Sequence, residues 1–428
     1  MLGLFMVMPV LAILALDYPG YSALMLGLAI GGYGLTQALL QIPMGVLSDK
    51  IGRKPVIIGG LLVFAVGSGV AAIADNMVWL VIGRFLQGAG AIAGAIMALA
   101  GDVSRESQRS KVMAIIGIAI GFSFYLALLL GPLIADNFGL RGIFAITGIL
   151  ALLCIPMLIW LVPNANNVAP KGDTLPVLTD LKALFFHHQL RQLNISVLIL
   201  HLLITLLFVQ IPTLLISFGW DLNNHWKLYL PVLLGSIISM AGLMILVKKT
   251  DQQKVIKLSI FILITVFVGM YLNHSLLGLM MLSWLFFSAF NFLEANFPAL
   301  VSSIAPAGKK GSAMGIYASF QFFGAFLGGV LSGGISEYLG SQWVFLTAGV
   351  ICLFWLMILR GLRGTEGLKR YTLKANLHGQ SVEQIGLRLA DIQGIRDITI
   401  VSDEDTVYLK VDSKQFKLRE AKHALKLE

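Results

Sequence analysis

The sequence has few charged residues: Asp, Glu, Lys and Arg make up 12% of its 428 residues, whereas 57% are hydrophobic. Soluble domains carry about 25% charged residues, so this shortage and a mean hydropathy of +0.85 argue against an ordinary globular protein. The same composition excludes a disordered chain, a collagen-like chain and a coiled coil. The two cysteines, Cys154 and Cys352, both lie inside apolar runs, which excludes a disulfide framework and a thiolate metal cluster.

The motifs of enzymes are missing as well. The chain has no Gly-x-x-x-x-Gly-Lys loop to hold nucleotide phosphates, which argues against an ATP-driven pump, and no Ser/His/Asp pattern that would suggest a hydrolase. We therefore predict a protein that is not an enzyme and has neither a cofactor nor a metal centre. Its energy source would then be an ion gradient, as in a secondary transporter.

What the sequence does contain is a series of long apolar runs. A helix needs about 20 apolar residues to cross a bilayer, and we predict twelve such spans, at 1–16, 23–47, 55–74, 78–100, 112–136, 142–162, 193–217, 229–247, 255–271, 276–304, 312–336 and 343–359. The first run is short and lacks the basic leader and cleavage site of a signal peptide. We expect the complete chain to begin upstream of Met1.

Lysine and arginine are unevenly divided between the two sides of these spans. If residue 1 faces the cytoplasm, the inner loops of the membrane part hold fifteen of them and the outer loops only Arg141 and Lys227. The positive-inside rule then places both termini in the cytoplasm. This explains the net charge of +9 without a nucleic-acid partner, and the lipid bilayer is the expected surrounding.

The spans divide into two sets of six. Residues 163–192 form the longest polar stretch of the membrane part, so we predict one half at 1–162, a cytoplasmic linker at 163–192 and a second half at 193–359. The halves share a weak echo at an offset of 201, for example Gly139 with Gly340 and Phe144 with Phe345. Such a duplication predicts a substrate site between the halves, near the middle of the membrane.

A soluble domain is predicted at 371–428. Its pattern indicates a strand at 371–377, a helix at 381–391, strands at 395–401 and 406–412, and a helix at 414–425, which is a small α+β domain of the ferredoxin-like kind. The loop 376–380 has no cysteine, so soft-metal binding is not expected. The tail could sense a ligand, bind a protein at its sheet edge, or cap the cytoplasmic face. Its partner is unknown.

Three motifs carry a family resemblance. The run Gly45-Val-Leu-Ser-Asp49-Lys-Ile-Gly52-Arg53-Lys54 resembles the loop 2–3 signature of the major facilitator superfamily, and the segment Arg84-Phe-Leu-Gln87-Gly88 resembles a motif of its drug:proton antiporters. Gly131-Pro132 resembles the core of the helix-5 antiporter motif, although its usual closing glycines are Ala135 and Asp136 here. With the tail, the whole chain resembles YajR-type transporters.

This resemblance implies an all-α fold of twelve helices in two halves, in a bacterial inner membrane, that exports a compound in exchange for protons. It also implies a gate at the inner end of helix 2. Asp49 would lie at the start of helix 11, near Gly311-Ser312, where the helix dipole favours a negative charge. Arg53 would meet Asp102 at the end of helix 4. Gly45, Gly52 and Lys54 complete the motif. The alternative for these basic residues is an inner loop that merely obeys the positive-inside rule.

Ionisable residues inside the spans are candidates for proton coupling. Glu294 lies near mid-membrane, where a carboxylate must be protonated or paired with a cation. His201 lies at a similar depth in the same half and could form a relay with it. Arg84 could modulate a carboxylate from the cavity, or could snorkel to the outer surface. Asp17, at an outer helix end, is expected to be solvated.

The substrate cavity is predicted to be mostly apolar, which favours a neutral or amphiphilic small molecule over a phosphate or a dicarboxylate. Each polar candidate for its lining could equally be a contact between helices. These candidates are Tyr33, Gln37, Gln41, Tyr125, Gln210, Trp284, Asn291, Asn296, Tyr317 and Gln321.

The leading hypothesis is therefore a proton-coupled exporter of small amphiphilic compounds. One alternative hypothesis keeps the fold but reverses the direction of transport, so that the protein takes up a nutrient or acts as a uniporter. The other alternative is a membrane receptor that binds a ligand without transport and signals through its tail.

Overall fold

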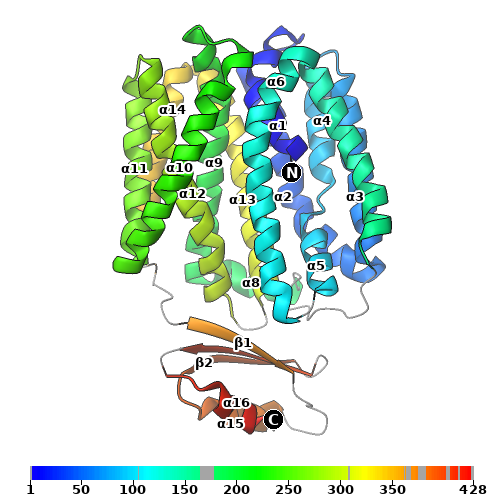
Figure 1. The fold of residues 1–428 in the computed structure, drawn as a ribbon, viewed down its shortest axis with the longest axis vertical. Helices are drawn as coiled ribbons and strands as arrows, with labels where there is room; N and C mark the ends of the chain where they lie inside the picture. Colours follow the sequence, from blue (N-terminus) through cyan, green and yellow to red (C-terminus); the bar gives the residue numbers. More distant parts are fainter. Residues whose placement is uncertain are drawn as a thin grey trace.

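The computed structural model describes residues 2–104, 106–163, 178–306, 309–360, 362, 368–374, 382–401, 405–412 and 415–425. Long helices run side by side in one bundle, and a small domain of strands and short helices lies against one end of it (Figure 1). We call the end of the bundle nearest this domain the domain-side end and the opposite end the far end.

The first set of helices comes from the N-terminal part of the chain. It comprises α1 (Leu2–Leu14), α2 (Ala23–Ile51), α3 (Arg53–Ala72), α4 (Met77–Ala89), α5 (Ala93–Val103) and α6 (Glu106–Leu161), with the short 3-10 helix η1 (Ala15–Asp17) after α1. Their apolar side chains form a core between α1, α2, α4 and α6. A smaller cluster joins α3 and α5 at the domain-side end.

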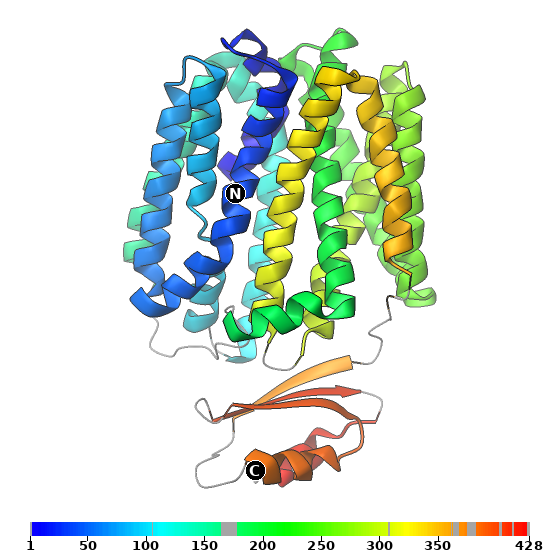
Figure 2. The ribbon, with the colours of Figure 1, turned by 180° about the vertical axis from the view of Figure 1, so that it is seen from behind.

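The second set packs around a larger core of its own. It comprises α8 (Leu178–Phe186), α9 (His188–Ser217), α10 (Trp226–Lys249), α11 (Gln252–Leu272), α12 (Leu276–Ile304), α13 (Lys310–Tyr338) and α14 (Ser341–Ile358), with the 3-10 helix η2 (Leu222–Asn224) before α10. The helix α8 lies across the domain-side end, roughly at right angles to the bundle (Figure 2). α9 begins at His188, five residues before its predicted span.

Ten helices of the described chain are long and apolar enough to cross a membrane. One of these, Lys111–Leu161, has 51 residues and covers two predicted spans, and a shorter apolar helix occupies Phe5–Asp17. The exact number of twelve spans stays a prediction. The span predicted at 78–100 lies within the candidate span Met77–Val103, but its helix is interrupted at Gly90, between α4 and α5. There the backbone passes so close to Gly60 of α3 that a side chain on Gly90 would collide with it.

Two glycines make equivalent turns in the two sets. Gly139 divides α6 into two helical parts with φ +63°, and Gly340 separates α13 from α14 with φ +100°. Only glycine adopts such positive φ values at low cost. These are two of the residues that repeat at an offset of 201, so the echo in the sequence coincides with a repeated backbone conformation.

The two sets meet along α2 and α13, which run side by side toward the far end (Figure 2). A methyl group added to Gly27 or Gly31 of α2 would collide with the backbone of Gly329 or Phe326 on α13. The close approach of the two backbones therefore depends on residues without a side chain, as it does in many membrane helix pairs.

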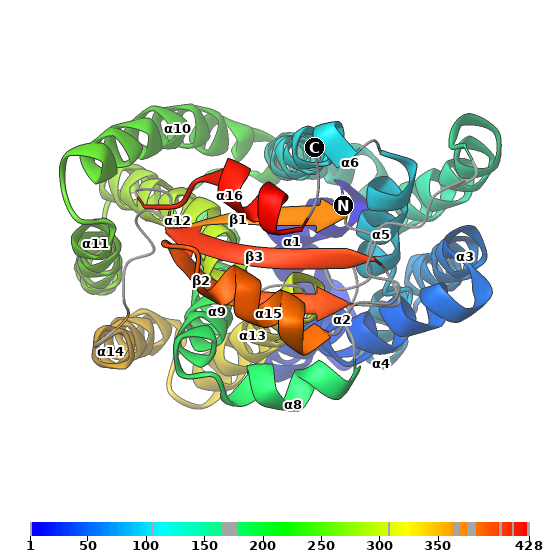
Figure 3. The ribbon, with the colours of Figure 1, turned by 90° about the horizontal axis from the view of Figure 1, so that it is seen from below.

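The domain at the C-terminal end has a three-stranded sheet. Its strands are β1 (Leu368–Lys374), β2 (Ile395–Val401) and β3 (Thr406–Asp412), in the order β1-β3-β2 with both pairs antiparallel. This is a split βαβ arrangement, and the ferredoxin-like fold stays a prediction. Helices α15 (Val382–Ala390) and α16 (Leu418–Ala424) cover one face of the sheet (Figure 3).

Two sequence predictions for this domain were wrong at their edges. The first strand begins at 368 rather than 371, and the part predicted at 375–377 lies outside the described residues. The last helix begins at Leu418 instead of 414, because Phe416 turns inward onto Tyr371, with ring centroids 5.3 Å apart. The strands at 395–401 and 406–412 have the predicted bounds.

The sheet faces the bundle with its other side (Figure 1). Lys410 of β3 donates from Nζ to the carbonyl oxygen of Ile304, the last residue of α12, at 2.9 Å. Tyr408, on the same strand and directed away from the domain's own core, is only 3% exposed. The domain is therefore docked on the bundle in this structure.

Candidate functional site

At the domain-side end, the turn between α2 and α3 holds a buried arginine. Arg53 donates from Nε to Oδ2 of Asp102, at the end of α5, at 2.9 Å. It also donates from Nη1 to Ser48 Oγ at 3.1 Å and from Nη2 to Asp49 Oδ1 at 3.2 Å. The side chains of Arg53 and Asp102 are 8% and 3% exposed. Their charges compensate each other away from water, and they tie α2, α3 and α5 together.

The neighbouring motif residues shape this turn. Gly52 has φ +98°, a conformation that favours glycine, and the carbonyl of Gly45 accepts a hydrogen bond from Ser48 Oγ at 2.7 Å. Lys54 donates from Nζ to the carbonyl oxygen of Val162, just beyond the end of α6, at 2.7 Å. A cation is favourable at the C-terminal end of a helix. The motif thus also holds α6.

The expected partner of Asp49 is the start of α13. That helix begins at Lys310, and both Gly311 and Ser312 are buried. A contact between Asp49 and this helix start stays a prediction.

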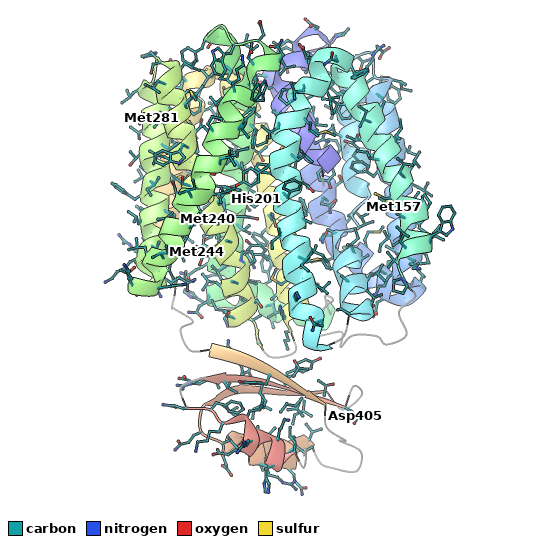
Figure 4. The ribbon with its side chains drawn as sticks, in the orientation of Figure 1. Met157, His201, Met240, Met244, Met281 and Asp405 are labelled. Atoms are coloured by element: carbon teal, nitrogen blue, oxygen red, sulfur yellow. The ribbon has the colours of Figure 1, made fainter. Side chains whose placement is uncertain are left out.

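A second polar cluster lies half-way along the bundle, where Figure 4 shows His201. The ring of His201 on α9 has its Nδ1 3.2 Å from the carbonyl oxygen of Val197, one turn earlier. Its Nε2 lies 2.8 Å from Nε2 of Gln321 on α13 and 3.8 Å from Oε2 of Glu294 on α12. The predicted neighbourhood of His201 and Glu294 is therefore present, and Gln321 joins it.

Glu294 has one oxygen engaged and one without a hydrogen bond. Gln321 Nε2 donates to Glu294 Oε1 at 3.4 Å. Within the described part of the chain, the buried Oε2 of Glu294 and the hydroxyl of Tyr317 have no hydrogen-bond partner. Tyr317 lies one turn before Gln321 on α13 and is 2% exposed. The cluster therefore brings a carboxylate, an imidazole and an amide together inside the bundle.

Arg84 lies in the other set of helices and is 1% exposed. It donates from Nε to the carbonyl of Ala29 at 2.9 Å and from Nη1 to Gln87 Oε1 at 2.7 Å, and its Cζ lies 5.4 Å from the ring centroid of Tyr33. Gln87 in turn donates to Ser68 Oγ at 2.8 Å. The alternative of a snorkelling arginine was wrong, because these partners hold the guanidinium inside the bundle.

Some polar candidates connect the two sets of helices. Asn291 of α12 donates from Nδ2 to the hydroxyl of Tyr125 on α6 at 2.8 Å and to Ser236 Oγ on α10 at 3.1 Å. This contact lies one turn toward the far end from Glu294. Because Tyr125 and Asn291 belong to different sets, it must change if the sets move apart at this level.

Three glutamines among the polar candidates make contacts within one set. Gln37 donates to Gln41 at 2.9 Å, and Gln210 of α9 donates to two serines of α13, Ser332 and Ser336, at 2.9 Å each. These amides therefore stabilise helix packing. Among the other candidates, Trp284 lies against Gly235, and the amide of Asn296 binds Gln252.

The helix-5 motif also packs helices together. A methyl group on Gly131 would collide with the backbone of Met6 on α1, so this glycine allows α6 to approach α1 closely. Pro132 follows inside α6. Of the two residues that replace the motif's closing glycines, Ala135 is buried and Asp136 is exposed at the far end.

An aromatic cluster bridges the two sets of helices. The ring of Phe124 on α6 lies between Phe5 of α1, with centroids 5.0 Å apart, and Phe208 of α9, at 5.9 Å. Phe287 of α12 completes the cluster at 6.5 Å from Phe124. Since Phe287 lies one turn beyond Asn291 on α12, the cluster is on the far-end side of Glu294.

At the far end, a charge-assisted hydrogen bond joins the two sets. Glu337, in the last turn of α13, accepts a hydrogen bond at Oε2 from the backbone N–H of Leu24 at 2.8 Å. This N–H belongs to the first turn of α2, where a negative charge is favourable. We call this contact the far-end latch. It mirrors the predicted contact of Asp49 at the opposite ends of the same two helices.

Comparisons with known proteins agree with these features. The family model described as Major Facilitator Superfamily matches residues 1–276 and again 253–384. The chain belongs to this superfamily. It is accordingly a membrane transporter and not an enzyme.

Within the superfamily, the chain is 38% identical to the inner membrane transport protein YajR of Escherichia coli (strain K12) over 97% of its own length and 92% of that protein. It is 24% identical to the quinolone resistance protein NorA of Staphylococcus aureus (strain MSSA476), over 82% and 90% of the two chains. The likeness to YajR agrees with the resemblance seen in the sequence.

Solved structures support the facilitator fold. A bacterial homologue of the human lysosomal transporter Spinster, in an inward-facing and occupied conformation, has a TM-score of 0.68 at 13% identity and covers 83% of this chain and 92% of its own. A point mutant of the nucleoside transporter NupG has a TM-score of 0.66 at 16% identity, with coverages of 85% and 98%.

Sequence reasoning missed several residues of this transporter. Gln87 stands in the quoted helix-4 motif, so the motif could have indicated it as a partner of Arg84. Ser68 carries no such signal. Glu337 could have been found as an acid at the end of a helix, by analogy with Asp49. The aromatic cluster around Phe124 has no signal in the pattern, because phenylalanines are common throughout the chain.

Proposed function

We propose that this facilitator is a proton-coupled exporter of small amphiphilic compounds, in a bacterial inner membrane with both termini in the cytoplasm. Residues 1–162 would rock against 193–359 around a central site, driven by the proton gradient. The domain-side end would then be the cytoplasmic end, and the far end would face the outside.

The observation that carries this proposal is the cluster of His201, Gln321 and Glu294. A carboxylate half-way through a membrane bundle is costly unless it is paired or protonated, and Glu294 has one oxygen bonded and one without a partner. Its side chain is 33% exposed. Such a carboxylate can load a proton from one side and release it to the other as access alternates.

The groups around this cluster favour an uncharged or amphiphilic substrate. The described side chains that contact His201 or Glu294 include Gln321, which is neutral, and Phe290, whose ring lies 6.0 Å from the imidazole. Arg84 lies in the other half and is held by its own network. The distant likeness to NorA, named for quinolone resistance, agrees with a drug-like substrate.

The contact between the halves at one end supports alternating access. The far-end latch and the α2/α13 glycines join the halves at the far end, whereas the Arg53 cluster lies within the first half at the domain-side end. A cycle that opens the far end and brings Asp49 onto the start of α13 at the other end would expose Glu294 to each side in turn. Coupling energies of about 1–3 kcal/mol are sufficient for such a switch.

The test is proton movement in everted membrane vesicles that hold a pH gradient. A panel of amphiphilic and polar compounds is added to vesicles with the wild-type protein, with Glu294→Gln, or with Asp17→Asn as a matched control. Asp17 is an exposed acid beyond the end of α1. Expression is matched between the three samples.

We expect at least one amphiphilic compound to collapse the gradient with the wild type and Asp17→Asn, and not with Glu294→Gln. An equal response in Glu294→Gln would contradict the role of Glu294 as proton carrier. Flux of a compound without proton movement would contradict the antiporter hypothesis and favour a uniporter or an uptake system. Binding without any flux would favour the receptor.

A further inference from the structure

The amide of Gln321 is placed where it contacts both members of the titratable pair. Its Nε2 lies 2.8 Å from His201 Nε2 and 3.4 Å from Glu294 Oε1. An amide nitrogen carries two hydrogens and no lone pair that accepts a bond. With the amide in this orientation, both partner atoms act as acceptors.

This requirement determines the protonation state of the imidazole. His201 Nδ1 faces the carbonyl oxygen of Val197 at 3.2 Å, and a carbonyl only accepts. Nδ1 must therefore carry the hydrogen, and Nε2 must hold a free lone pair toward Gln321. The geometry fits a neutral His201 with one defined tautomer.

The same geometry tolerates a proton on Glu294. A hydrogen on Oε2, the oxygen without a hydrogen bond, leaves Oε1 as an acceptor for the amide. A hydrogen on His201 Nε2, in contrast, would place two donors 2.8 Å apart. Rotation of the amide would relieve this clash, but its oxygen would then face Oε1 of Glu294, and that oxygen would have to carry the carboxyl hydrogen.

We propose that Gln321 is the positioning residue that assigns the transported proton to Glu294. It does so by holding His201 neutral as an acceptor. This inference rests on the proposed proton-coupled function. The proton enters at Glu294 Oε2 and leaves from it, and His201 fixes the amide without becoming charged.

The position of Gln321 also links the pair to the contact between the halves. The next residue, Phe322, packs its ring on Tyr33 of α2 with centroids 6.4 Å apart, and a methyl group on Gly34 of α2 would collide with the Phe322 carbonyl. A change at Gln321 therefore acts on α13 where it touches the other half. The other titratable groups near this point are Tyr317 on α13 and, beyond Phe322, Tyr33 and Arg84.

The experiment is ¹⁵N NMR of the histidine rings in nanodiscs, at neutral pH and without substrate, with His201→Gln used to assign the His201 signal. We expect the wild type to give the neutral tautomer with hydrogen on Nδ1. Gln321→Leu should give a mixture of tautomers and the charged form. Gln321→Glu, which offers an acceptor in place of the donor, should give the charged ring.

Gln210→Leu is the matched control, because it removes another amide between α9 and α13 that does not touch His201. We expect its ring signals to equal those of the wild type. An unchanged His201 signal in both Gln321 variants, or a charged ring in the wild type, would overturn the inference. The NMR measurement does not depend on transport, so the two tests can fail separately. If the vesicle test fails but the His201 tautomer still depends on Gln321, the proposed transport function is refuted and the role of the amide stands.

Discussion

The far-end latch should set the balance between the two states of the transporter. The contact consists of one charge-assisted hydrogen bond, from the Leu24 N–H to Glu337 Oε2 at 2.8 Å, at an exposed position. A negative charge at an exposed helix start contributes about 0.3–1 kcal/mol, and the hydrogen bond of a helix cap about 1 kcal/mol. Glu337→Gln keeps an acceptor and loses the charge, whereas Glu337→Ala loses both.

We therefore expect Glu337→Gln to weaken far-end closure by about 0.5 kcal/mol, a roughly twofold shift in the ratio of states. Glu337→Ala should weaken it by about 1.5 kcal/mol, which is roughly tenfold. The measurement is the distance distribution between spin labels at the far ends of α2 and α13, in nanodiscs and in a background without Cys154 and Cys352. High salt should reduce the difference between wild type and Glu337→Gln, because it screens an exposed charge.

Asp136→Asn is the control, since it removes another exposed acid at the far end. The reasoning fails if Glu337→Ala leaves the distribution unchanged, or if Asp136→Asn shifts it as much. It also fails if the two Glu337 variants shift the balance equally, because the charge and the bond would then not be separate contributions.

Three further predictions follow from other contacts. Arg53→Ala should destabilise the protein by about 3–5 kcal/mol, because it leaves the buried Asp102 uncompensated, and adding Asp102→Asn should restore part of the loss; thermal unfolding in detergent measures both. Gly329→Ala should abolish transport by forcing α2 and α13 apart, whereas Gly334→Ala, with open space around it, should transport normally; vesicle flux decides. Burial, together with the charge of Lys410 on β3, lowers the pKa of His187 below its usual 6.5. The docked tail therefore favours neutral His187, so docking should be strongest above pH 6.5 and should weaken below it. Hydrogen exchange at the end of α12 would show this, and His187→Gln should remove the dependence.

Much of the membrane fold could be predicted because its signal is long and repeated. Apolar runs of bilayer length located the helices, and the family signature in loop 2–3 correctly paired Arg53 with Asp102. The break at Gly90 was missed because hydropathy measures composition and not backbone path. In the tail, the strand at 368 was placed three residues late because its first residues include Lys369 and Arg370, which hide the alternation.

The central cluster could be predicted only in part. The depth of Glu294 and His201 follows from counting residues along two helices, so their proximity was a reasonable hypothesis. The bridging role of Gln321 depends on the rotation of α13 about its axis, which the sequence of this helix alone does not determine. The same holds for Arg84, whose partners lie on α2 and within its own helix. Counting residues along the helix could not distinguish a buried Arg84 from one that snorkels.

The docked tail is attached to one half of the transporter. It follows α14 in the chain and binds the end of α12 through Lys410, so it has two connections to the second half and would move with that half. If the halves rock as proposed, the tail would move with the second half relative to the first. A molecule that binds between the tail and the first half would then slow the cycle without entering the central site.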